Sequence, residues 1–182
     1  GFKDWSAYQG VSFWLLGTNS GGTVIFQLKS DGANQQASNR YEVNLTDDVA
    51  GWRLVRLLWS AFHKGAGYNP GPNPDAPINP AKMWGYAFIL PPGAAVFAAD
   101  EINLYGGQGQ ITPPPPPSVS ALIEDFNGGL PADGVFVYGR DESDAGGHIT
   151  VAAQAADLPV VPAIAGNQAL SVDFSNAGWG GY

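Results

Sequence analysis

Short apolar runs recur along the chain, and clusters of turn-forming residues separate them. Residues 11–16 and 23–29 flank a Gly- and Asn-rich turn, and residues 41–45 and 52–57 flank the acidic turn at 47–51. Runs of this length between turn clusters predict β-strands, and we expect each of these two pairs to form a hairpin. No segment shows the sustained helical periodicity, with caps, that an α-helix requires.

The same pattern continues to the carboxyl end of the chain. Further candidate strands lie at residues 84–90, 98–105, 121–126, 134–138, 148–152 and 169–174. Their spacing is typical of a β-sandwich. The 25 glycines and 15 prolines in 182 residues fit many short strands joined by tight turns. The sequence therefore predicts an all-β fold built as an antiparallel β-sandwich.

A run of five prolines, residues 113–117, divides the chain. Such a run forms an extended polyproline II spacer without internal hydrogen bonds. A proline-rich ligand for a partner's groove is the alternative, but flanking basic residues are lacking. We therefore divide the chain into residues 1–110, a polyproline linker at 111–119, and residues 120–182. The last piece is small for a stable domain without disulfides, and we interpret it as incomplete.

Composition removes several classes of function. The absence of cysteine excludes disulfides, thiolate metal sites and cysteine nucleophiles. A net charge of -8 gives no positive field for nucleic acid or an anionic membrane, and no apolar run approaches the roughly 18 residues of a membrane span. Low lysine content and a possible glycosylation sequon at Asn44 favour an extracellular or cell-surface location.

Residues that could perform catalysis are few. His63 and His148 stand in no metal-binding pattern. The acidic groups Asp47-Asp48, Glu124-Asp125 and residues 141–144 could supply the two carboxylates of a glycosidase. Such clusters more often cap turns, and no serine lies in a nucleophile elbow. We therefore expect a protein without enzymatic activity.

The order of motifs in residues 1–110 resembles the later two thirds of family-eleven carbohydrate-binding modules and related galactose-binding-like jelly rolls. The motifs are DWSAYQGVSFW at 4–14, YEV at 41–43, GWR at 51–53, WSAF at 59–62 and DEINLYG at 100–106. The opening strands of that family resemble IEDFNGG at 123–129, QALSVDF at 168–174 and GWGGY at 178–182, which here come last. The resemblance thus covers nearly the whole chain, with its two parts in circularly permuted order.

This order allows three arrangements of a jelly-roll sandwich. The chain folds back on itself, or it is one period of a tandem array, or its carboxyl piece completes a neighbouring subunit. The last two give a head-to-tail polymer of copies of this chain. Our first prediction is a non-catalytic extracellular structural subunit or repeat of a filament, surface layer or matrix. The alternative is a carbohydrate-binding module with a β-glucan-type ligand, from a secreted polysaccharide-degrading enzyme.

The resemblance also implies two sets of site residues. Tyr68 lies in a loop that matches a cleft loop of the family, and Asn69 and His63 are its candidate polar companions for a sugar. In that loop Gly65 and Gly67 replace the charged neighbours expected there, which is why the structural role is placed first. The related jelly rolls hold a structural calcium ion, and its implied ligands here are Asp100, Asp125, Glu124 and Asn127. Ordinary turn capping is the alternative for these four residues.

Overall fold

The computed structural model describes most of the chain. It describes residues 1–90, 92–107, 121–130, 148–157, 159, 166–176 and 180–181. The proline run at 113–117, the predicted strand at 134–138 and the acidic group at 141–144 lie outside the described residues.

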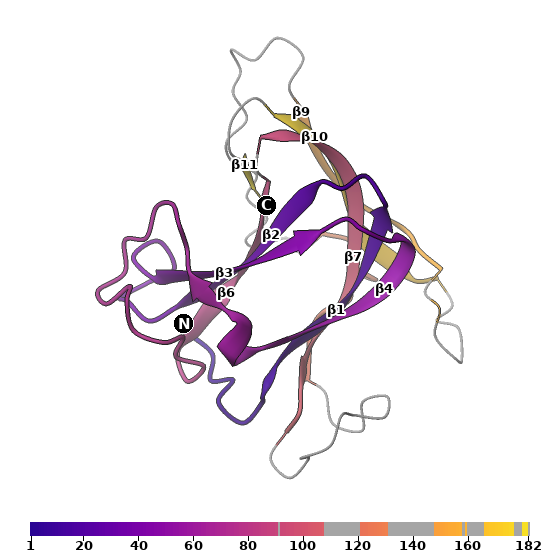
Figure 1. Cartoon of the computed structure of the whole chain (residues 1–182). Helices are drawn as coiled ribbons and strands as arrows, with labels where there is room; N and C mark the ends of the chain where they lie inside the picture. The colour runs from indigo at the N-terminus through magenta and orange to yellow at the C-terminus, as the bar shows by residue number, and fades with distance from the viewer. Residues whose placement is uncertain are drawn as a thin grey trace.

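Almost every described element is a β-strand (Figure 1). The strands are β1 Gly10–Thr18, β2 Thr23–Ser30, β3 Asn39–Thr46, β4 Ala50–Leu58, β5 His63–Lys64, β6 Met83–Leu90, β7 Gly93–Tyr105, β8 Ala121–Glu124, β9 His148–Ala155, β10 Gln168–Asn176 and β11 Gly180–Gly181. A single turn of 3-10 helix, η1 Trp59–Ala61, joins β4 to β5.

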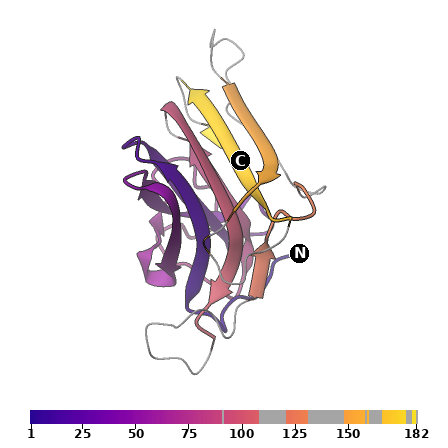
Figure 2. The same ribbon diagram turned by 90° about the vertical axis from the view of Figure 1, so that its right-hand side faces the viewer.

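The strands form two antiparallel sheets. One sheet has six strands in the order β4-β1-β7-β10-β9, with β8 also paired to β7. Figure 2 shows this sheet with β1, β7, β10 and β9 side by side. The other sheet has five strands in the order β11-β6-β2-β3-β5. The predicted antiparallel β-sandwich is therefore confirmed.

The two expected hairpins are wrong. β1 pairs with β4 and β7, whereas β2 pairs with β3 and β6, so that each expected pair is split between the two sheets. Phe13 of β1 and Phe26 of β2 meet across the core with ring centroids 4.8 Å apart. Alternation in the sequence shows which side chains are buried. It does not show whether the strand after a turn joins the same sheet or the opposite sheet of the sandwich.

Both ends of the chain contribute to one core. Phe13, Phe26 and Phe88 lie in the same buried cluster as Leu170 and Phe174. β10 pairs with β7 along seven positions, and β8 pairs with the end of β7. The described strands β8, β10 and β11 therefore pair with strands of their own chain in this structure.

Lys3, near the start of the chain, and β11, near its end, lie along the same edge of β6. β11 pairs with Leu90 and Ile89 at one end of the strand, and Lys3 forms an isolated bridge with Met83 at the other end. Because β2 occupies the opposite edge of β6, Lys3 and β11 share the remaining edge.

Candidate functional site

A row of polar side chains points away from the core on the five-stranded sheet. Phe26 and Leu28 of β2 are fully buried between the sheets, so Gln27 and Lys29 point to the other side. The register places Glu42 opposite Gln27, and Arg40 opposite Lys29. We call this side the outer face.

Hydrogen bonds fix most of this row in place. Gln27 Nε2 donates to Glu42 Oε1 at 2.7 Å. The Arg40 guanidinium donates to the carbonyl oxygens of Gln35 and Gln36 and to Ser38 Oγ. Because these bonds join the side chains to one another or to the segment just before β3, the side chains are preorganised and would lose little freedom on binding a ligand.

Lys29 differs from the rest of the row. It is half-buried, and burial together with the charge of Arg40 lowers the pKa of its amine to about 8. Among the described residues no carboxylate forms an ion pair with it. On its other side the register partner is Gly85, which has no side chain. A cationic group therefore stands on this face beside an open backbone.

The three residues predicted to bind sugar lie together beside β3. Tyr68 is 79% exposed in the loop between β5 and β6. Asn69 fastens that loop to β3, because its Oδ1 accepts from the Arg40 backbone N–H at 2.9 Å and its Nδ2 donates to the Arg40 carbonyl at 3.1 Å. His63 is exposed and lies opposite Glu42 in the register. Their part in sugar binding stays a prediction.

Sequence reasoning did not single out Gln27, Lys29, Arg40 and Glu42. These four residues occupy alternate positions of β2 and β3, and three of them, Gln27, Arg40 and Glu42, are themselves at most 8% exposed. The signal in the sequence was the polar residue at every second position of each predicted strand. These residues could be placed on one common face only after β2 and β3 were known to be neighbours.

The predicted calcium ligands lie at the junction of β7 with the carboxyl strands. Asp100 is fully buried; its Oδ1 accepts from the Glu101 backbone N–H at 2.8 Å and its Oδ2 from Asn167 Nδ2 at 2.5 Å. Burial raises the pKa of Asp100 to about 6; the hydrogen bonds from Asn167 and Glu101 oppose this, and the charges of Glu101 and Asp125 add to it. Such a buried acid beside further acids favours a cation.

The hydrogen bonds found for the other predicted calcium ligands, Asn127, Asp125 and Glu124, lead to groups other than Asp100. Asn127 Oδ1 accepts from the Gln168 backbone N–H at 2.7 Å, and the Asn127 backbone N–H donates to Asp125. Glu124 pairs with Ile102 through its backbone, and its side chain is not among those described. In the described part of the chain no three His, Asp or Glu side chains gather closely enough to hold a metal.

One further oxygen fits a hard cation. Asn167 is 4% exposed, and its Oδ1 is buried without a hydrogen-bond partner. Calcium binds carboxylate and amide oxygens together. The amide oxygen of Asn167 therefore adds a third candidate ligand to the carboxylates of Asp100 and Asp125. Sequence analysis missed Asn167, because nothing in the sequence places it beside Asp100.

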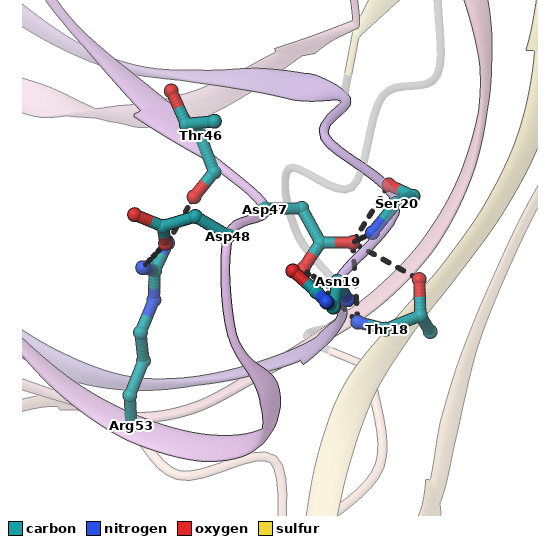
Figure 3. A network of polar contacts seen from close by, with 7 residues as sticks. All are labelled: Thr18, Asn19, Ser20, Thr46, Asp47, Asp48 and Arg53. Carbon is teal, nitrogen blue, oxygen red and sulfur yellow. Dashed lines mark hydrogen bonds and ion pairs between the residues drawn. The ribbon is translucent and has the colours of Figure 1, made fainter.

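In the acidic turn, the Asp47 side chain holds the turn at residues 18–20 in place (Figure 3). The Asp47 carboxylate accepts hydrogen bonds from the backbone N–H groups of Thr18, Asn19 and Ser20 and from the hydroxyls of Thr18 and Ser20. Burial acts to raise the pKa of Asp47, but these bonds hold it well below its usual range. A carboxyl that stays ionised in this way is no general acid at neutral pH.

The family model described as carbohydrate binding domain (family 11) matches residues 1–107. Neither a curated protein nor a solved structure matches the chain. None of the described residues belongs to a helix with the length and apolar character of a membrane span.

Proposed function

Because the chain belongs to family 11 of the carbohydrate-binding domains, we propose that it binds a polysaccharide chain along the outer face of the five-stranded sheet. The observation that carries this proposal is the exposed ring of Tyr68, in a loop that is fastened to β3 beside the fixed polar groups of Gln27, Glu42 and Arg40, which are 7–8% exposed. The proposed role is binding without catalysis, by a domain of a secreted protein that acts on or attaches to polysaccharide.

The chemistry of these groups suits a sugar. A pyranose presents hydroxyl groups at its rim and apolar C–H groups on its faces. The amide of Gln27 and the carboxylate of Glu42 offer a donor and acceptors for hydroxyls, while an aromatic ring such as Tyr68 offers a surface for a C–H face. A β-glucan, whose rings present flat faces along an extended chain, is the ligand type that we place first.

Affinity electrophoresis tests the proposal. Wild-type protein is run in native gels that contain soluble β-glucans, neutral or carboxylated, beside the variants Tyr68→Ala and Leu58→Ala. Leu58 is 48% exposed on the six-stranded sheet, so its truncation is a matched control. We expect retardation of the wild type and of Leu58→Ala, and its loss in Tyr68→Ala. No retardation of the wild type by any glucan would refute the proposed function.

We also propose that a structural calcium ion is held by Asp100, Asp125 and the amide oxygen of Asn167. The support is the buried Asn167 Oδ1 without a partner and the buried, negatively charged surroundings of Asp100. When bound, the ion would join β7 to the segments around residues 125 and 167, and its charge would replace the proton that burial favours on Asp100.

Thermal unfolding with calcium or with a chelator tests this site. We expect calcium to raise the Tm of the wild type, and Asp100→Asn to abolish the rise while leaving the calcium-free Tm unchanged or higher, because a buried charge is removed. The control is Asp173→Asn, an exposed carboxylate of β10, which should keep the full response. An equal Tm rise in Asp100→Asn would contradict the assignment.

A head-to-tail polymer is the second candidate. Its support is the position of the proline run between β7 and β8 in the sequence, because strand exchange between copies needs a spacer at this point. Denaturing mass spectrometry and negative-stain microscopy of native material test it. Fibres that dissolve to chains of 19.0 kDa would support exchange. A globular monomer of that mass would refute it.

A further inference from the structure

Gly71, in the loop between β5 and β6, lies directly against the start of β3. A Cβ atom built on Gly71 would overlap Asn39 Oδ1 and the Asn39 backbone nitrogen. The Asn39 side chain has no exposed surface into which it could turn, and its backbone belongs to the strand. Only a glycine therefore allows the loop to lie this close to β3.

Asn39 is itself a buried part of this contact. Its Nδ2 donates to the Asn73 carbonyl of the same loop at 3.0 Å. Its Oδ1 is buried, and no described residue offers it a hydrogen bond. Burial of an acceptor without a donor is unfavourable, so the docked loop depends on its other hydrogen bonds.

Asn69 supplies two of those hydrogen bonds. Its Oδ1 accepts from the Arg40 backbone N–H at 2.9 Å, and its Nδ2 donates to the Arg40 carbonyl at 3.1 Å. The backbone N–H of Gly65 donates to the same carbonyl at 2.8 Å. Both ends of the Asn69 amide are thus engaged with the backbone of β3, and this fastens the loop to the strand.

Tyr68 lies between these anchors, three residues after Gly65 and three before Gly71. Because Tyr68 is 79% exposed, contacts of its own ring with the protein contribute little to its position. The backbone contacts on either side of it must therefore determine where the ring stands.

From these contacts we infer that Asn69 and Gly71 are positioning residues, which seat the loop on β3 and so hold Tyr68 in place for a polysaccharide. The inference rests on the proposed function, and it gives Asn69 a role through Tyr68 in place of a direct contact with the sugar. If only the docked loop presents Tyr68 correctly, the apparent affinity falls in proportion to the fraction of molecules that are docked. Weakened docking and weakened binding must then appear together.

Gly71→Ala and Gly67→Ala are a matched pair of substitutions in this loop. Neither glycine has a positive φ, and a Cβ atom on Gly67 would meet nothing within 4 Å. The reporter is the Arg40 amide, whose acceptor, Asn69 Oδ1, is removed by neither substitution. We expect its hydrogen exchange to be roughly tenfold faster in Gly71→Ala and unchanged in Gly67→Ala. Amides of β7 should exchange in both variants as in the wild type.

Calorimetric titration with cellotetraose measures binding by the same variants. We expect Gly71→Ala to bind roughly tenfold more weakly than the wild type, and Gly67→Ala to bind within about twofold of it. Saturation with cellotetraose should also slow the Arg40 exchange in Gly71→Ala towards the wild-type rate, because a ligand that prefers the docked loop stabilises it. Damage unconnected with binding would not be reversed in this way.

Asn69→Ala is a second variant, which adds no bulk and decides the matter if Gly71→Ala disturbs β7. It removes both bonds to Arg40, and its reporter is the Gly65 amide, which donates to the Arg40 carbonyl. We expect faster Gly65 exchange together with weaker binding. Weaker binding at an unchanged Gly65 exchange rate would overturn the positioning role and leave Asn69 as a direct contact of the sugar.

The remaining outcomes separate the inference from the proposed function. Wild-type exchange and wild-type affinity in Gly71→Ala would overturn the inference and leave carbohydrate binding standing. Faster Arg40 exchange without weaker binding would overturn it as well, because a displaced loop would still bind. Binding of cellotetraose by neither the wild type nor the variants would refute the β-glucan-type ligand and with it the positioning role, while the Arg40 exchange would still show whether Gly71 seats the loop.

Discussion

Asp47 shows how one side chain can join two turns. Its carboxylate follows β3, and the groups that it binds follow β1, at the same end of the sandwich. The packing is tight, because a Cβ atom on Gly17 would come within 2.2 Å of Asp47 Oδ1. The turns that sequence analysis assigned to two hairpins are thus fastened to each other across the sheets.

Replacing Asp47 with Asn should destabilise the protein. An amide retains one acceptor oxygen and loses the charge, so several N–H and O–H donors of the 18–20 turn lose their partner. We expect a loss of about 1–2 kcal/mol in the free energy of unfolding, a value reduced by the partial exposure of the site. Urea unfolding at pH 7 measures it. The neighbouring Asp48→Asn, which breaks only the exposed contact to Arg53, should cost less than about 0.5 kcal/mol.

The contribution of Asp47 should also depend on pH. Because its folded-state pKa lies below the ordinary value of about 4, the unfolded chain takes up the proton first. The stabilisation is therefore fully present above about pH 4 and is lost as the pH falls further. We expect the stability difference between wild type and Asp47→Asn to shrink as the pH falls from about 4 to about 2. A difference that stays constant over this range would contradict the account.

At this scale the sequence indicated part of the proposed site. Tyr68 and Asp100 were singled out because they lie in a loop and a motif that match the family in order, and their roles stay predictions. Lys29 was not, since a lysine at the polar phase of a strand is ordinarily solvated, and only the register shows Arg40 and Gly85 on its two sides. Asn167 meets Asp100 across 67 positions of sequence, which no local pattern reveals.

Among the elements, the loop between β5 and β6 determines how Tyr68 is presented. This loop has little secondary structure, and side chains fasten it to β3. Tyr41 is buried in the core and its hydroxyl donates to the Ala76 carbonyl at 2.9 Å, while Asn39 Nδ2 donates to the Asn73 carbonyl at 3.0 Å. The loop is therefore attached to the strand that also carries Arg40 and Glu42.

Removing the Tyr41 hydroxyl should loosen this loop without disturbing the core. Tyr41→Phe keeps the buried ring and leaves two loop carbonyls, of Ala76 and Pro77, without their donor. We expect a loss of about 1 kcal/mol in the free energy of unfolding and faster amide hydrogen exchange in residues 65–78. Amides of β7 should exchange as in the wild type; a uniform increase over the whole chain would show instead that the core had been damaged.

Strands were easier to predict than their pairing. Most of the runs found in the sequence became strands, because alternation reflects burial of one face. Their assignment to sheets depends on contacts such as that of Phe13 with Phe26, which join residues of different sheets. Turn composition at 19–22 fits a hairpin equally well, and only the whole sandwich decides between the two connections.

For the whole molecule, the carboxyl strands are part of the core. Leu170, Val172 and Phe174 are at most 2% exposed, and β10 covers one edge of β7. A fragment of residues 1–110 would expose the residues against which they pack. Burial of each such side chain contributes roughly 1.5–3 kcal/mol, so their joint loss is comparable to the whole stability of a domain.

We therefore expect the fragment 1–110 to show no cooperative thermal transition. Addition of the separate piece 120–182 should restore it, because both parts are needed for one core. Circular dichroism at rising temperature measures both results. A cooperative transition in the fragment alone would show that residues 1–110 form an independent domain.

The shared edge of β6 has a consequence for joining the chain ends. From Ile89 to Met83 the strand advances six residues, about 20 Å, whereas the four peptide steps from Gly181 to Lys3 through Tyr182 and Gly1 reach about 14 Å. A direct peptide bond between the termini would therefore be strained, and two inserted glycines would relieve it. Backbone cyclisation with such an insert would restrict the unfolded chain and leave the native strands in place, so the ring should be more heat-resistant than the open chain.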